Sequence, residues 1–216
     1  MDYAAARHNM VVSQIRPNKV TDPALIAALQ ELPRELFVPK ALRGIAYVDE
    51  DIALADGRYL MEPMVLARLL QAAAVEPTEM ALDVGCASGY STAVLARLSS
   101  AVVGLESNQA LAVEAGDHLS ELNIDNAVIV EGPLGDGWPR QAPYDVILLG
   151  GRVEQIPPGI IGQLAEGGRL VTVIGGSGMG RACVITRHGA TSSRRPIFDA
   201  AVRPLPGFER QQGFVF

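Results

Sequence analysis

The chain has 216 residues, a formal net charge of −6, 49% hydrophobic residues and only 5% aromatic ones. The acidic balance argues against a general nucleic-acid binder, and no apolar run approaches the ~20 residues of a membrane span. A core of this size built from Ala, Val, Leu and Ile suits a parallel sheet with both faces covered. The first residues contain no secretory hydrophobic region, so we expect a cytoplasmic protein.

The first 63 residues are predicted to form an N-terminal helical extension that ends in a loop. A helix is expected over residues 2–16, where Pro17 ends it, and a second helix begins at Asp22-Pro23, a capping residue followed by proline. Residues 33–39 form a short rigid segment. An acidic loop at 46–51 and a loop with an Asp-Gly turn at 56–63 complete this part.

From residue 63 onward, helical and strand patterns alternate. Helices are expected at 64–74, 91–98, 110–122 and 157–164, and strands at 80–84, 101–106, 127–131, 144–149 and 168–174. This rhythm predicts an α/β protein with a doubly wound parallel sheet. A Gly-rich turn then leads to strands at 181–186 and 197–205, expected as an antiparallel hairpin on one sheet edge. No repeat or linker is visible, so residues 1–216 are expected to form a single domain.

The most informative stretch runs from Asp83 to Tyr90, where a strand meets a helix through a turn of small residues. Small side chains let a ligand lie on the backbone beside the N-terminus of the helix. Glu106 ends the next strand, which is the place of an acid that binds ribose hydroxyls. The Gly spacing of dinucleotide sites is absent. Acid-x-Gly-x-small-x-Gly is instead the pattern of S-adenosylmethionine (SAM) methyltransferases. The alternative is a strand–turn–helix corner that binds nothing.

Neither the cysteines nor the histidines have a spacing typical of a metal site. Cys86 and Cys183 are far apart, and His8, His118 and His188 do not cluster in sequence. We therefore expect no metal. Cys86 lies in the loop of small residues, so we interpret it as a packing residue rather than a nucleophile.

Further blocks follow one another along nearly the whole chain: Met10–Arg16, Pro33–Pro39, Ala46-Tyr47 with a following acid, the Gly57 loop ending at Pro63, Gly137-Trp138-Pro139, Ala142–Asp145 and Gly167–Val171. Together with residues 83–90, these blocks resemble the protein-L-isoaspartate (D-aspartate) O-methyltransferase family. The block at 33–39 and Gly-Trp-Pro carry most of this resemblance, because the other blocks are common to many methyltransferases. The resemblance implies a SAM methyltransferase, Rossmann-like fold with an antiparallel C-terminal hairpin.

The resemblance also implies a repair enzyme whose cofactor is SAM and whose partners are isoaspartyl-containing proteins or peptides. Such enzymes methylate the free carboxylate of an isoaspartyl residue, and the ester collapses to a succinimide that hydrolyses partly to aspartate. A carboxylate is already ionised at pH 7, so the transfer needs no general base. The protein mainly aligns the two reactants.

The acceptor loop departs from the family pattern Gly-x-Thr-Ile-Ser-Gln-Pro. Tyr59 stands at the threonine position, Met61 at the serine position and Glu62 at the glutamine position, so these are the candidates for the catalytic loop. Glu62 would add negative charge beside an anionic acceptor. Arg58 could pair with a carboxylate there. The alternative interpretation of Tyr59, Met61 and Glu62 is an ordinary loop.

The cofactor positions also depart from the family. Ala87 replaces a usual Gly, which is tolerable if its φ is negative. Pro133 replaces an Asp, which removes a carboxylate and an N–H; Asp136 could substitute or lie on the surface. The candidates for cofactor binding are Asp83, Gly85, Cys86, Ala87, Gly89, Glu106, Ser107, Pro133 and Leu134.

Three hypotheses stay open on the sequence. The first is a SAM-dependent methyltransferase acting on isoaspartyl carboxylates. The second keeps SAM but changes the acceptor, and the third is a methyltransferase fold that serves as a non-catalytic binding module. The oligomeric state does not follow from the sequence.

Overall fold

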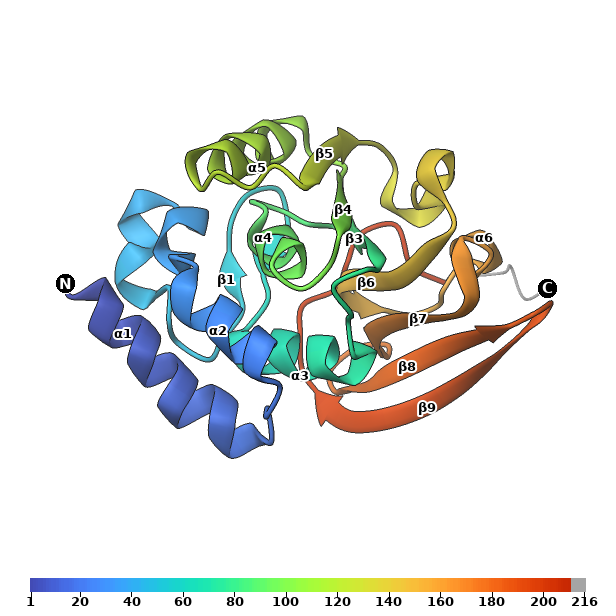
Figure 1. The fold of residues 1–216 in the computed structure, drawn as a ribbon, viewed down its shortest axis with the longest axis horizontal. Coiled ribbons are helices and arrows are strands. Elements are labelled where there is room, and N and C mark those ends of the chain that lie inside the picture. The colour runs from blue at the N-terminus through green and yellow to red at the C-terminus, as the bar shows by residue number, and fades with distance from the viewer. Residues whose placement is uncertain (211–216) are drawn as a thin grey trace.

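A seven-stranded sheet forms the centre of the protein in the computed structural model, which describes residues 1–210 (Figure 1). The strand order is β5-β4-β3-β6-β7-β8-β9. The strands are β3 (Met80–Val84), β4 (Ala101–Glu106), β5 (Ala127–Glu131), β6 (Tyr144–Val153), β7 (Leu164–Ile174), β8 (Gly180–His188) and β9 (Thr191–Ala200). Strands β3 to β7 pair in parallel, whereas β8 and β9 are antiparallel. The predicted parallel sheet with an antiparallel hairpin at one edge is confirmed.

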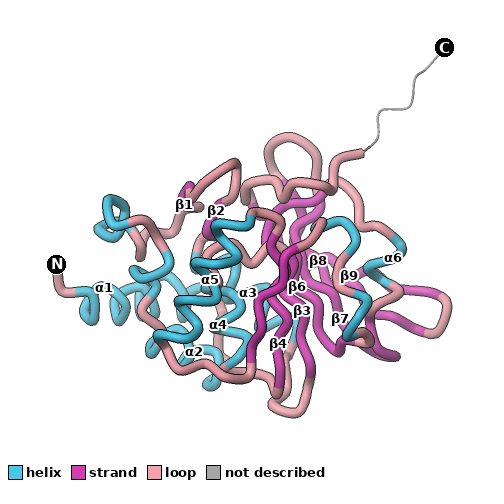
Figure 2. The backbone as a smooth tube through the Cα atoms, turned by 90° about the horizontal axis from the view of Figure 1, so that it is seen from above, coloured by secondary structure: helices cyan, strands magenta, loops and turns pink. Residues whose placement is uncertain are grey.

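The two faces of the sheet carry separate cores, because successive residues of a strand point to opposite sides. On β6, Val146 and Leu148 belong to the larger core, while Ile147 and Leu149 belong to the smaller one. Figure 2 shows α1 to α5 on one side of the sheet and α6 on the other. The helices in the sheet region are α3 (Pro63–Ala73), α4 (Tyr90–Ala96), α5 (Gln109–Glu121) and the short α6 (Pro158–Ile161).

The N-terminal extension is helical, as predicted, and packs into the larger core. It contains α1 (Tyr3–Met10), which continues through a π-helical turn to residue 15, and α2 (Pro23–Glu31). Asp22 caps α2 by accepting a hydrogen bond from the Leu25 amide at 2.9 Å. The fully buried Arg34 donates to the carbonyls of Ala46 and Met61, both at 2.7 Å. The extension is therefore fixed to the loop that precedes α3.

The second strand of the C-terminal hairpin was predicted in the wrong place. It was expected at 197–205 and lies at Thr191–Ala200. The hairpin turns at Gly189, whose φ is +58°, so the strand begins immediately afterwards. Residues 191–195 are exposed on the outer edge of the sheet and therefore show no apolar alternation. Two smaller differences from the prediction remain. Helix α6 ends at Ile161, before the expected end at residue 164. A hairpin of β1 (Ile52–Ala53) with β2 (Tyr59–Leu60) was not predicted.

Residues 201–210 leave the sheet and run beside the end of β6. The Arg152 amide donates to the Arg203 carbonyl at 2.9 Å, and the Leu205 amide donates to the Arg152 carbonyl at 2.8 Å. Leu205 and Phe208 are buried in the smaller core. Residues that were predicted to be part of a strand thus cover the carboxyl end of the sheet.

Candidate functional site

The predicted site residues gather where β3 has β4 on one side and β6 on the other. The chain runs outward from β3 in both directions, and this switch in strand order leaves a crevice at the carboxyl ends of the strands. Gly85 follows β3, Glu106 ends β4 and Gly132 follows β5. Gly150 of β6 lies against this edge, since a Cβ there would be 2.7 Å from the Gly85 carbonyl oxygen.

The loop between β3 and α4 repeats a left-handed backbone conformation at every second residue. The φ angles are +79° at Gly85, +51° at Ala87 and +96° at Gly89. The amides of Gly85 and Cys86 both donate to the Leu105 carbonyl, at 2.8 and 3.1 Å. The two glycines suit this geometry, whereas Ala87 carries a methyl group in the conformation that its side chain disfavours.

Asp83 is buried near the carboxyl end of β3, and only one of its carboxylate oxygens accepts hydrogen bonds. Its Oδ2 accepts hydrogen bonds from Ser91 Oγ at 2.6 Å and Thr92 Oγ1 at 2.7 Å. Its Oδ1 has no hydrogen-bond partner among residues 1–210. Burial raises the pKa of Asp83 to about 6, against the lowering effect of the two hydroxyls. Burial also raises the pKa of the Cys86 thiol, which agrees with a packing role.

Glu106 is fully buried and accepts hydrogen bonds on both carboxylate oxygens. Arg58 donates to it from Nε at 3.1 and 3.3 Å and from Nη2 at 3.0 Å. The backbone amides of Ala87, Ser107 and Asn108 donate as well, at 2.8, 2.8 and 3.0 Å. Burial alone would raise the pKa of Glu106, but the Arg58 guanidinium and these donors hold it below its usual value.

Pro133 and Leu134 lie at the start of a short 3-10 helix after β5. Leu134 is buried in the smaller core, which also contains Leu205 and Phe208. Asp136, the residue considered as a substitute carboxylate, is exposed in the same short helix, which agrees with the surface alternative. Neither Pro133 nor Leu134 lines the cavities described below.

The loop that leads into α3 lies beside the loop that contains Gly85, and residues of both line one cavity. Met61 is buried and Tyr59 is half-buried on β2. Glu62 directly precedes α3, and its amide donates to Asp51 Oδ1 at 2.8 Å. Burial and the neighbouring charges of Asp49, Asp51 and Glu50 raise the pKa of Glu62 to about 7.

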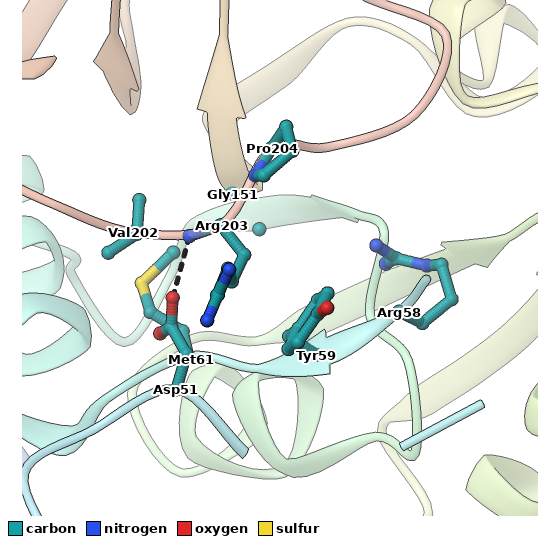
Figure 3. Close-up of a pocket in the computed structure, with 9 residues that line it drawn as sticks. Asp51, Arg58, Tyr59, Met61, Gly151, Val202, Arg203 and Pro204 are labelled. Carbon is teal, nitrogen blue, oxygen red and sulfur yellow. Dashed lines mark hydrogen bonds between the residues drawn. The ribbon is translucent and has the colours of Figure 1, made fainter. Parts of the chain in front are cut away.

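Two small cavities lie between these loops. One, of about 20 Å³, is lined by residues of both loops: Tyr59, Leu60, Met61, Leu66, Gly85, Cys86, Ala87, Tyr90, Ser91, Leu148 and Gly150. The other, of about 10 Å³, lies among Asp51, Tyr59, Met61 and residues 202–204 (Figure 3). In Figure 3, Tyr59 lies between Arg203 and Arg58, and the Arg203 amide donates to Asp51 at 2.6 Å.

The structure thus brings Tyr59 and Met61 beside Gly85, Cys86 and Ala87. Sequence reasoning missed two parts of the site. It assigned Arg58 to an acceptor carboxylate, whereas Arg58 contacts the protein's own Glu106. It also missed Leu205, whose Cδ1 would be 2.5 Å from a Cβ on Gly85. The sequence contained one signal for the role of Arg58: a carboxylate at the position of Glu106, if it is buried, needs a nearby cation.

Residues 1–210 contain no group of three or more His, Cys, Asp or Glu residues placed to hold a metal ion. They also contain no helix that is long and apolar enough to cross a membrane. Both cysteines are buried free thiols.

Comparison with known proteins points to one family. The model of the family described as protein-L-isoaspartate(D-aspartate) O-methyltransferase matches residues 6–200. Protein-L-isoaspartate O-methyltransferase 1 of Rhodopseudomonas palustris is 35% identical over 209 residues, which cover 96% of this chain and 85% of the relative. The enzyme of that name from Koribacter versatilis is 33% identical over 205 residues, with coverage of 95% and 92%.

Solved structures show the same fold. A protein-L-isoaspartate O-methyltransferase has a TM-score of 0.80 at 24% identity, with coverage of 93% of this chain and 66% of the solved chain. A Plasmodium falciparum protein assigned to this enzyme type, solved with S-adenosyl-L-homocysteine, has a TM-score of 0.77 at 20% identity, with coverage of 94% and 97%. The predicted methyltransferase fold is confirmed.

Replacement of Asp83 by Asn is expected to remove a pH-dependent destabilisation. The folded-state pKa of about 6 exceeds the ordinary aspartate pKa of 3.8, so the native state binds the proton more tightly than the unfolded state does. Wild-type stability relative to Asp83→Asn should therefore increase as the pH falls from above 6 toward 4, by on the order of 2–3 kcal/mol. Urea unfolding of both proteins at a series of pH values measures this difference. A difference that stays constant with pH would contradict the burial argument.

Replacement of Ala87 by Gly is expected to leave stability unchanged or to raise it by up to about 1 kcal/mol. Relief of the left-handed strain, about 1–2 kcal/mol, outweighs the loss of one buried methyl group, about 0.8 kcal/mol. Ala93→Gly, inside α4, is the matched control and should lose about 1 kcal/mol or more. Urea unfolding at pH 7 compares the two variants, and equal losses would refute the strain at Ala87.

Proposed function

The chain belongs to the protein-L-isoaspartate (D-aspartate) O-methyltransferase family, whose members are SAM-dependent methyltransferases, and we propose that isoaspartyl residues of proteins are its methyl acceptors. The observation that carries the proposal is the family match over residues 6–200. Relatives that share 33–35% identity over almost the whole chain carry this enzyme name. The cofactor of the family is SAM.

The proposed reaction forms a methyl ester on the free carboxylate of an isoaspartyl residue. The acceptor carboxylate is ionised at pH 7, so no base has to remove a proton from it. The backbone amide nitrogen that follows the ester attacks the ester carbonyl, and the C–O bond to the methoxy group breaks with loss of methanol, a far better leaving group than the oxygen of a free carboxylate. The resulting succinimide hydrolyses partly to aspartate. The protein would thus act in protein repair. Two buried free thiols support a reducing compartment, which we take to be the cytoplasm.

Asp83, Gly85 and Glu106 are the residues that we propose to hold the cofactor. Asp83 would accept from the cationic amino group of the cofactor, and its unpartnered Oδ1 supports this role. Glu106, with the adjacent Ser107 amide, would lie at the ribose. In the described conformation the cleft does not fit the whole cofactor, because Arg58 and Leu205 cover Gly85 and the cavity beside it is about 20 Å³.

We assign the acceptor end to the Tyr59–Glu62 loop and to Arg203. Arg203 is exposed, and its guanidinium lies 5.3 Å from the centre of the Tyr59 ring, at the cavity of Figure 3. It would supply positive charge for an anionic acceptor. The shared core of the N-terminal extension and the sheet supports a single domain, in which residues 1–63 hold this loop in place.

A methyl-transfer assay tests the proposal. The protein is incubated with radiolabelled SAM and a peptide that contains one isoaspartyl residue, and base-released methanol is counted. We expect turnover with this peptide and none with the same peptide carrying normal aspartate. Asp83→Asn should lower the turnover. SAM binding without turnover on the isoaspartyl peptide would favour a different acceptor, and absence of SAM binding would refute the proposal.

The acids around Glu62 are expected to oppose an anionic acceptor at high pH. Glu62 ionises as the pH rises through about 7, next to Asp49 and Asp51. Replacement by Gln should therefore lower KM for the isoaspartyl peptide about threefold at pH 8, the size of a partly exposed charge interaction, with little change at pH 6. Steady-state kinetics measure this. Glu50→Gln in the exposed acidic loop is the control, and an equal effect there would assign the change to net charge alone.

A further inference from the structure

Arg58 extends from the β1–β2 hairpin into the predicted cofactor crevice and ties three segments together. Its guanidinium pairs with Glu106 at the end of β4, at 3.0 Å, with side-chain exposures of only 4% and 0%. Its Nη2 also donates to the Gly85 carbonyl at 2.8 Å. The hairpin, the end of β4 and the loop after β3 are thus held by one side chain.

This contact leaves Glu106 no free acceptor position. A carboxylate has about four lone-pair sites, and besides Arg58 three backbone amides and the Ser107 hydroxyl, at 3.3 Å, already donate to Glu106. The amides belong to the loops themselves and stay in place. Displacement of the Ser107 hydroxyl would free only one acceptor position, so a pair of ribose hydroxyls also needs a position that Arg58 now uses.

The same side chain also occupies the space above the loop. A Cβ on Gly85 would lie 2.7 Å from Arg58 Nη2 and 2.5 Å from Leu205 Cδ1. The cavity that remains beside the loop, about 20 Å³, has room for about one water molecule but not for a nucleoside. A nucleoside needs both Arg58 and Leu205 to move.

We propose that Arg58 is an internal competitor for the adenosine half of the cofactor, so that SAM binds only after the Arg58–Glu106 pair has opened. The inference rests on the SAM dependence of the proposed function. Because only the open fraction of molecules binds, the apparent affinity is reduced by that fraction. Arg58 thereby sets the cofactor concentration at which the enzyme works.

The hairpin that carries Arg58 has few attachments that opening must break. Each of its strands has two residues, and the tip at Asp56-Gly57 is exposed. Asp56 Oδ2 accepts a hydrogen bond from Asn108 Nδ2 at 2.6 Å, at the exposed start of α5. Rotation of the Arg58 side chain toward solvent therefore leaves the sheet intact.

Calorimetric titration with S-adenosyl-L-homocysteine (SAH) tests the proposal. Arg58→Gln removes the positive charge and the paired N–H donors of the guanidinium. We therefore expect this variant to bind SAH at least tenfold more tightly than the wild type. Its Tm without ligand should fall. Arg152→Gln is the matched control. Arg152 belongs to β6, donates to the Gly178 carbonyl and does not contact Glu106. Its SAH affinity should equal that of the wild type.

Each outcome is decisive. Equal or weaker SAH binding by Arg58→Gln would overturn the competition and leave the proposed function standing. Binding by neither protein at millimolar SAH would refute both the competition and the cofactor assignment. An equal increase in SAH affinity in the Arg152→Gln variant would also overturn the specific role of Arg58.

A measurement on the wild type covers the case in which Arg58→Gln fails to fold. Trp138, the single tryptophan, lies over Gly132, whose amide donates to the Glu106 carbonyl at 3.1 Å. Stopped-flow fluorescence of Trp138 during SAH binding should give a rate that levels off at high SAH, because opening precedes binding. A rate that rises linearly with SAH over the whole range would overturn the proposal.

Discussion

The buried charge of Glu106 is the constraint on which the site depends. A carboxylate removed from water is costly unless it is paired and hydrogen-bonded, and Glu106 has no exposed surface. Three backbone amides and the Arg58 guanidinium meet this requirement. These donors come from three segments, so the Glu106 side chain fixes the relative positions of the loop after β3, the turn before α5 and the β1–β2 hairpin.

The unequal cover of the two sheet faces decides which parts of the site can move. Helices α3 to α5 and the N-terminal extension form a large core on one face. The other face is covered by the short α6, a 3-10 turn and residues 201–210. The carboxyl edge of the sheet is therefore closed by the hairpin and by Leu205, which lie in short segments, rather than by a packed helix. Access to the crevice can change without loss of either core.

The sequence predicted the parallel strands because each is a continuous apolar run bounded by turns. It failed at β9, whose polar residues 191–195 form an exposed edge, and at 201–205, whose apolar residues cover a loop rather than extend a strand. At the site, the positions of Gly85, Ala87 and Glu106 followed from the strand–turn–helix pattern. The partner of Arg58 did not, because a sequence shows that an arginine is present but not which of several carboxylates it meets. The positive φ of Ala87 could not be predicted either, because alanine can adopt a positive φ, although at a higher free-energy cost than a negative one.

The two carboxylates of the crevice are in opposite electrostatic states. Asp83 has an unpartnered oxygen and a raised pKa of about 6, so a cationic group placed beside it would relieve an existing cost. Glu106 has a surplus of donors and a lowered pKa, so any ligand that reaches it must replace a favourable contact. A ligand with a cation at one end and hydroxyls at the other would therefore be stabilised by its contact with Asp83, and part of that stabilisation would be offset by the contacts that Glu106 loses. The departures from the family pattern in the acceptor loop and at Ala87 lie on the walls of this crevice, while the packing blocks of the family are retained. In the proposed function, the balance between these two carboxylates would set how strongly the crevice holds its ligand.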